Sequence, residues 1–223
     1  MKKLNDKALE ISHSKLTFFG RVTAGLTHEI KNGLAIIKEE TGLVLDLIKM
    51  IQKGHQADFD RMASELDKVQ KRIGVTDEIV KDLNRFSHSV DQVEQVFDLS
   101  ELLALMVKLV NRFARMHNVE IKITKASEQI QIQNNFFMVE QILFIFIEEA
   151  IKSAGKGGKV QIAVEQTPGF GSYVLCGSWE RALEPFQSDR ELFDYFLKIS
   201  NCKIIFHEKD SKTILSFPII NDS

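Results

Sequence analysis

Proline and glycine are scarce in this chain, which has 3 prolines and 12 glycines among 223 residues. No proline precedes Pro168. The proline ring removes an amide donor and breaks the interior of a helix. Its absence therefore leaves the first two thirds of the chain free to form long helices.

Cysteine is scarce as well, and the chain has neither a large net charge nor a long apolar run. The two cysteines, Cys176 and Cys202, give neither a metal-ligand spacing nor a disulfide framework, so we expect buried thiols in a reducing compartment. The formal net charge of -2 argues against nucleic acid or an anionic membrane as the main partner. The most apolar run, residues 142–147, is too short to span a bilayer, and no signal peptide follows the N-terminal lysines. We therefore expect a cytoplasmic protein.

Apolar side chains recur every three to four residues through residues 14–52, which predicts a long amphipathic helix. Gly54 stands where a left-handed helix end is often found, and Asp58 is a suitable N-cap for a second helix of the same period. Two long helices joined by a short loop predict an antiparallel hairpin. One hairpin covers its own apolar stripe poorly, so we expect a homodimer that forms a four-helix bundle. The stripe residues are Phe19, Val22, Leu26, Ile30, Leu34, Ile37, Val44 and Ile48, then Phe59, Met62, Leu66, Val69, Ile73, Leu83, Phe86 and Val90.

The pattern changes near Asp98, where short strands begin to alternate with helices. Asp98 and Glu101 have the spacing of a capping box. The alternation predicts an α+β fold, in which a two-layer α/β sandwich follows the hairpin. We expect an N-terminal extension over residues 1–14, the hairpin over residues 15–95 and the sandwich over residues 96–223. Its helices are expected at residues 99–116, 136–154 and 188–200, and its strands at residues 120–124, 130–133, 159–165, 172–175, 203–207 and 213–217.

The segment with the clearest chemical content lies in the first helix. His28 is flanked by polar residues, and Asn32 follows four residues later on the same helical face. An accessible imidazole is a nucleophile near neutral pH, because its unperturbed pKa is about 6.5. The carboxylate of Glu29 could hold the ring and stabilise the cation that develops on attack, while the Asn32 amide could position a water. The alternative is a solvated helix surface with no chemical role.

This segment resembles the H-box of sensor histidine kinases. The matching positions are Leu26, His28, Glu29, Ile30, Lys31, Asn32 and Leu34. Gly33 is a departure, because the family has proline there; glycine also weakens a helix, by about 1 kcal/mol relative to alanine. The resemblance implies that His28 accepts a phosphoryl group and that Glu29 assists the transfer. It also implies that Asn32 orients water when a receiver's phosphoaspartate is hydrolysed.

The second half resembles the family's GHKL-type ATP-binding domain in the order of its elements, but poorly in its chemistry. Residues 139–154 resemble the N-box helix, yet Ile145 and Glu149 stand where the family has asparagines, the second of which binds magnesium. The adenine-binding Asp-x-Gly-x-Gly motif is replaced by residues 176–180, which read Cys-Gly-Ser-Trp-Glu. The resemblance therefore implies a degenerate site.

A later part of the same domain departs from the family as well. Glu184-Pro185-Phe186 is similar to a short family motif. A glycine-rich lid should follow, because bare backbone must approach the phosphates closely. Residues 187–190 offer side chains and acidic charge instead, and the chain has no glycine after Gly177. We therefore expect no ATP cofactor.

We interpret the chain as a two-component or phosphorelay protein, similar in layout to the histidine phosphotransferases of phosphorelays. The catalytic residues would be His28, Glu29 and Asn32, acting on the receiver domain of a response regulator as a phosphotransferase or a phosphatase without ATP-dependent kinase activity. No metal is expected on this chain, and any magnesium would be carried by the receiver. Two alternatives stay open: an active histidine kinase with divergent nucleotide boxes, and a non-catalytic adaptor that binds a regulator or a kinase.

Overall fold

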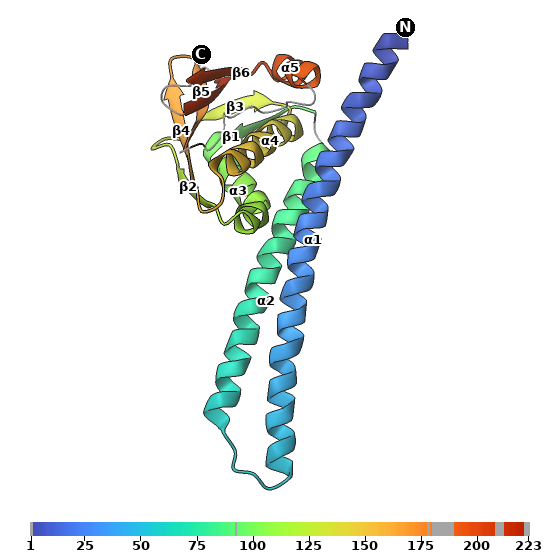
Figure 1. Ribbon diagram of the computed structural model, residues 1–223, viewed down its shortest axis with the longest axis vertical. Coiled ribbons are helices and arrows are strands. Elements are labelled where there is room, and N and C mark those ends of the chain that lie inside the picture. The colour runs from blue at the N-terminus through green and yellow to red at the C-terminus, as the bar shows by residue number, and fades with distance from the viewer. Residues whose placement is uncertain (1, 92, 178, 180–189, 208–211, 221–223) are drawn as a thin grey trace. The chain divides into compact units, whose positions relative to one another are not determined.

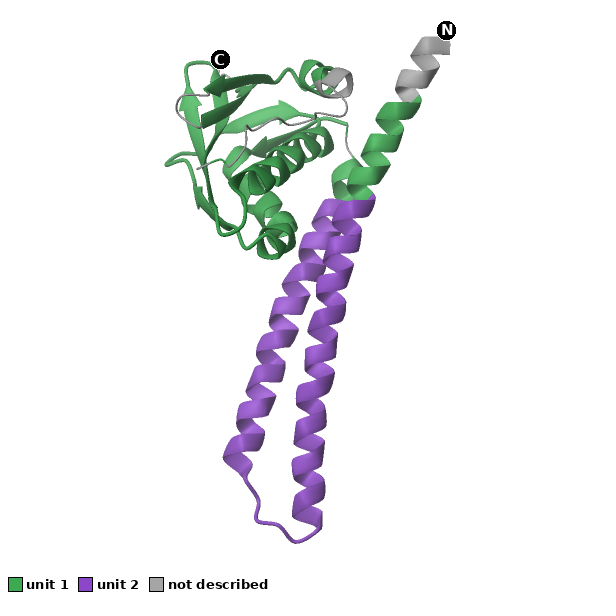
Figure 2. Cartoon of the chain, in the orientation of Figure 1, with its two compact units in different colours: residues 1–19, 88–223 green, residues 20–87 purple. Residues whose placement is uncertain are grey.

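The computed structural model describes residues 2–91, 93–177, 179, 190–207 and 212–220. Two long helices are followed by an α/β domain, so the predicted α+β fold is confirmed. Figure 2 shows two compact units, one of residues 20–87 and the other of residues 1–19 together with residues 88–223. The domain boundaries expected from the sequence, after residues 14 and 95, stay predictions.

A helical hairpin makes up the unit of residues 20–87. It is formed by α1 (Lys2–Gln52), which continues from the other unit, and α2 (Phe59–Ser87). Gly54, in the loop, has a φ of 92°, a left-handed conformation that glycine adopts without a Cβ clash. The Asp58 carboxylate accepts a hydrogen bond of 2.9 Å from the backbone N–H of Arg61. Both predicted signals for the loop are therefore confirmed.

Three charged side chains join the two helices of the hairpin. Glu65 on α2 is buried, and Lys68 Nζ donates to its two carboxylate oxygens at 3.0 and 2.9 Å. This hydrogen bond lowers the pKa of Glu65. Glu40 on α1 shares a hydrogen bond with Glu65, which raises the pKa of Glu40. Because Glu40 lies on α1 and Glu65 on α2, this hydrogen bond helps to fix the register of the two helices.

The α/β domain packs α3 and α4 against a five-stranded sheet in the order β2-β4-β5-β7-β6 (Figure 1). β2 and β4 are parallel and the other neighbours antiparallel, while β1 and β3 pair separately. The predicted two-layer sandwich is therefore confirmed. Its elements are η1 (His88–Val90), β1 (Gln95–Asp98), α3 (Leu99–Met116), β2 (Glu120–Thr124), β3 (Gln131–Asn134), α4 (Phe136–Ala154), β4 (Lys159–Thr167), β5 (Phe170–Gly177), α5 (Arg190–Ile199), β6 (Lys203–His207) and β7 (Lys212–Pro218).

The side chain of Asp98 organises the start of this domain. Its Oδ1 accepts a hydrogen bond of 2.9 Å from Glu101 N and caps α3, as the sequence predicts. Its Oδ2 accepts a second bond, of 2.8 Å, from Ile130 N. The buried Tyr173 hydroxyl donates to the carbonyl of Leu99 at 3.0 Å, and burial raises the pKa of this phenol well above its usual value. These bonds tie α3 to the strands on both sides of it.

The first residues of α1 pack on α4 within the same compact unit. The ring of Phe18 lies 5.3 Å from that of Phe137 and 5.2 Å from that of Phe144, centroid to centroid. Gln141 Nε2 donates to Ser14 Oγ at 2.9 Å. The sequence predicts a helix start near Ser14, but α1 begins at Lys2. No proline or glycine interrupts these first residues, and the contact with α4 stabilises them.

Each described helix is too short or too polar to cross a membrane. The cytoplasmic location stays a prediction. Both cysteines are free thiols. Cys202 is buried, and burial raises the pKa of its thiol, so it remains protonated and unreactive. Cys176 is half-buried rather than buried as expected, because it lies at the end of β5.

Candidate functional site

His28 lies on the exposed face of α1, one turn before Asn32. His28 Nδ1 is 3.1 Å from Asn32 Nδ2. Either the amide donates to an unprotonated Nδ1, or the amide is turned and its oxygen accepts the Nδ1 proton. In the second arrangement the lone pair of Nε2 is directed away from Asn32. An imidazole nitrogen of this kind is a competent nucleophile for phosphoryl transfer.

The buried face of α1 holds His28 outward. Val22 and Leu26 are only 3% and 6% exposed, whereas His28 and Asn32 are exposed. Glu29 is half-buried and follows His28 at about 100° around the helix. The structure thus brings Asn32 to His28 and places Glu29 beside it along the chain. The roles of Glu29 in transfer and of Asn32 in orienting water stay predictions.

The helix that resembles the N-box, α4, begins and ends where the sequence predicts. Lys152 Nζ lies 3.0 Å from Glu148 Oε1 and 4.0 Å from Glu149 Oε2. The ammonium is closer to Glu148 than to Glu149, which stands where the family has its magnesium ligand. A metal ion at Glu149 would nevertheless lie near this positive charge, which disfavours it. In the part of the chain that the structure describes, no three His, Cys, Asp or Glu side chains are grouped to hold a metal ion.

The indole of Trp179 lies against Gly177 at the end of β5. A Cβ atom added to Gly177 would lie 2.5 and 2.6 Å from two indole carbons and 2.9 Å from the carbonyl oxygen of Lys159. Because Gly177 has no side chain, the indole of Trp179 can pack directly against its backbone. Sequence reasoning missed this contact, because a glycine two residues before a tryptophan is also common in ordinary loops.

Several positions with a predicted role lie outside the described residues. They are residue 178 and residues 180–189, which include Glu184-Pro185-Phe186 and most of the segment expected in place of the lid. α5 begins directly afterwards, at Arg190. The chemistry expected for these positions stays a prediction.

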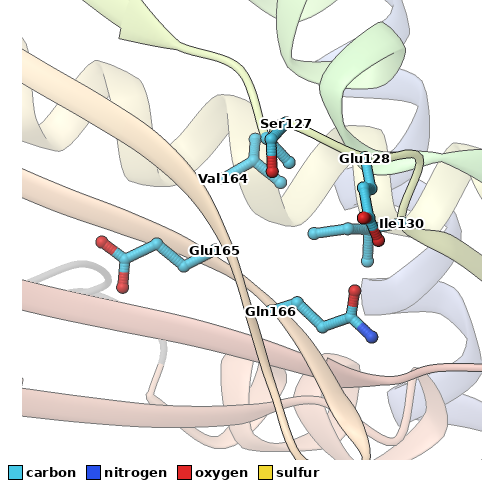
Figure 3. Close-up of a pocket in the computed structure, with 7 residues that line it drawn as sticks. Ser127, Glu128, Ile130, Val164, Glu165 and Gln166 are labelled. Carbon is cyan, nitrogen blue, oxygen red and sulfur yellow. The ribbon is translucent and has the colours of Figure 1, made fainter.

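A hollow of about 550 Å³ lies elsewhere in the α/β domain, between the β2–β3 loop and the end of β4 (Figure 3). Its lining includes the buried Ile130 and Val164 together with two carboxylates, Glu128 and Glu165. Figure 3 shows Glu165 and Gln166 pointing to opposite sides of β4. None of the predicted site residues lines it, and its negative charge disfavours phosphate. We therefore assign the hollow no role in phosphate chemistry.

The sequence is similar to curated histidine kinases. It is 25% identical over 158 residues to sporulation kinase A of Bacillus subtilis (strain 168), covering 71% of this chain and 24% of that protein. It is 24% identical over 182 residues to the sensor histidine kinase ZraS of Escherichia coli (strain K12), covering 82% of this chain and 37% of that protein. The chain thus spans about a quarter to somewhat over a third of these relatives. No family model matches it.

Solved structures of histidine kinases are also similar. AdeS of Acinetobacter baumannii is 15% identical with a TM-score of 0.48, covering 87% of this chain and 98% of that chain. ThkA, solved in complex with the response regulator protein TrrA, is 18% identical with a TM-score of 0.48, covering 96% of this chain and 66% of that chain. The chain is thus similar in sequence to histidine kinases. In its second half, helices and strands alternate as the resemblance to the ATP-binding domain of that family led us to expect.

Replacing Gly177 by alanine should displace Trp179. The new methyl group would overlap the indole and the Lys159 carbonyl, so we expect a red shift of tryptophan emission and a loss of about 1–3 kcal/mol in the free energy of unfolding. Trp179 is the only tryptophan, so emission reports on this contact alone. Gly42→Ala is the control, because a Cβ there meets nothing within 4 Å. Unshifted emission in Gly177→Ala would refute the packing.

Proposed function

We propose that this protein moves phosphoryl groups to or from the receiver domain of a response regulator through His28, without ATP-dependent kinase activity. One contrast carries the proposal. His28 is exposed and hydrogen-bonded to Asn32, whereas the segments that resemble a nucleotide site lack the family's magnesium-binding asparagine and its adenine-binding motif. There Lys152 pairs with Glu148, and Trp179 packs on the glycine that ends β5.

The transfer itself needs only a nucleophile and an acyl phosphate. His28 Nε2 attacks the phosphorus, the bond from phosphorus to the aspartyl oxygen breaks, and the receiver's aspartate leaves as a carboxylate. Asn32 accepts the Nδ1–H hydrogen bond, and Glu29 stabilises the positive charge on the ring. The reverse step returns the group to a receiver. In hydrolysis, Asn32 orients the attacking water, so transferase and phosphatase activities use the same residues.

An active but divergent kinase is the second candidate, because the relatives named above are kinases. It requires α4 and the end of β5 to hold a nucleotide with its magnesium. The Lys152 ammonium, 4.0 Å from Glu149, disfavours a metal ion at that carboxylate. The packing of Trp179 on Gly177 disfavours a nucleotide at the end of β5. A non-catalytic adaptor is the third candidate, and it leaves His28 without a chemical role.

Exposed apolar residues on α2 support a homodimer. They recur every seven positions, at Phe59 (71% exposed), Leu66 (47%), Ile73 (50%) and Val80 (37%). A spacing of seven keeps them on one face of the helix. Apolar surface gains about 25 cal/mol per Å² when it leaves water, and a second hairpin packed alongside would bury the stripe as in four-helix bundles. In such a dimer two copies of His28 would face two receivers.

A receiver domain that carries a labelled phosphoaspartate should pass the label to the full chain or lose it as inorganic phosphate. His28→Ala should abolish transfer to the chain because the nucleophile is gone. Asn32→Ala should slow exchange by about 10- to 100-fold, because the ring loses its partner. His55→Ala, an exposed histidine in the hairpin loop, is the matched control. Receiver binding that is unchanged in His28→Ala, without any exchange in wild type, would favour the adaptor.

The double variant Leu66→Lys/Ile73→Lys should be monomeric, because two ammonium groups cannot be buried against a second hairpin. Light scattering after size exclusion should give wild type about twice the chain mass of 25.4 kDa and the variant the chain mass itself. Val75→Lys is the control, since Val75 is equally exposed (51%) but lies on another face of α2. A dimer that survives the double variant would contradict the assigned interface.

A further inference from the structure

Gly33 lies directly after Asn32, on the buried face of α1. A Cβ added there would overlap Thr76 Oγ1 of α2 and would lie 3.4 Å from both Thr76 Cβ and Thr76 Cγ2. The other glycines of α1 differ, because a Cβ at Gly20, Gly25 or Gly42 meets nothing within 4 Å. At residue 33 the backbone of α1 is therefore in direct contact with a side chain of α2.

Thr76 cannot easily move aside. Its hydroxyl donates to the carbonyl of Arg72 at 2.9 Å, and the residue is only 8% exposed. Its β-branched side chain is stiff, since χ1 in a helix is confined to few rotamers. Any group larger than hydrogen at residue 33 must therefore shift the α1 backbone away from α2.

The backbone at residue 33 is joined to the peptide of Asn32, whose side chain holds the ring of His28 at 3.1 Å. We infer that Thr76 is a positioning residue for the phosphoryl-transfer site. By packing on Gly33, Thr76 fixes the position of the helical turn that carries Asn32, and Asn32 in turn orients the ring of His28. This inference rests on the proposed function. Thr76 lies on α2, outside the segment of α1 that resembles the H-box, so the resemblance gives it no role.

The close contact gives Gly33 a purpose different from helix flexibility. If Gly33 served to make the helix flexible, its replacement by alanine would lower phosphoryl exchange whatever residue stood at position 76. If Gly33 instead serves to leave space for Thr76, a smaller side chain at residue 76 should restore exchange in Gly33→Ala. Gly33→Ala/Thr76→Ala removes that bulk, whereas Gly33→Ala/Thr76→Val keeps a branched side chain of nearly the same shape. The pair of double variants therefore separates the two explanations.

The test combines phosphoryl exchange with a labelled receiver and the ¹⁵N shift of the His28 imidazole in the full chain. Gly33→Ala should lower exchange by at least about tenfold and move the Nδ1 shift toward that of Asn32→Ala. Gly33→Ala/Thr76→Ala should restore exchange to within about threefold of wild type and return the Nδ1 shift, whereas the valine variant should not. The His28 signal is assigned by its loss in His28→Ala.

The control is Gly42→Ala, which lies on the same helix in open space. It should leave both readouts unchanged. Equal damage in all three Gly33 variants would overturn the inference in favour of a flexible joint, and an unmoved Nδ1 shift in Gly33→Ala would overturn it outright. Absence of exchange in wild type would instead refute the proposed function, while the nitrogen shifts would still decide the role of Thr76.

Discussion

One continuous helix, α1, decides where each side chain around His28 lies. Successive residues are turned by about 100°, so burying Val22, Leu26 and Gly33 on one side leaves His28 and Asn32 on the other. The apolar face stabilises the hairpin, and the same constraint leaves the imidazole exposed. Folding and chemistry thus depend on a single periodicity, and the site needs no loop of its own to hold it.

The contacts that stabilise the α/β domain involve other residues than those at the nucleotide-binding positions of the resembling family. Burial keeps α4 and the sheet together, as the fully buried Phe146 and Tyr173 illustrate. These buried contacts do not involve the residues at the nucleotide-binding positions. At those positions the chain has an ion pair that includes Lys152 and a glycine covered by Trp179. The packing of the buried core therefore leaves the residue types at these positions unconstrained.

Local patterns in the sequence predicted most of the fold. The period of α4 and the capping residue Asp98 located their helices well, because propensity and capping act over a few residues. The His28–Asn32 contact followed from helical spacing. The early start of α1, the strand β1 and the contacts at Gly33 and Gly177 were not predicted, because each depends on residues distant in sequence or on space that a motif does not describe.

We propose that His28 handles phosphoryl groups that this chain does not take from ATP. Incubation of the full chain with magnesium and γ-labelled ATP, beside His28→Ala, tests it most directly. We expect no acid-labile label on either protein and no nucleotide binding. Acid-labile label on wild type alone would contradict it and would make the protein a working kinase.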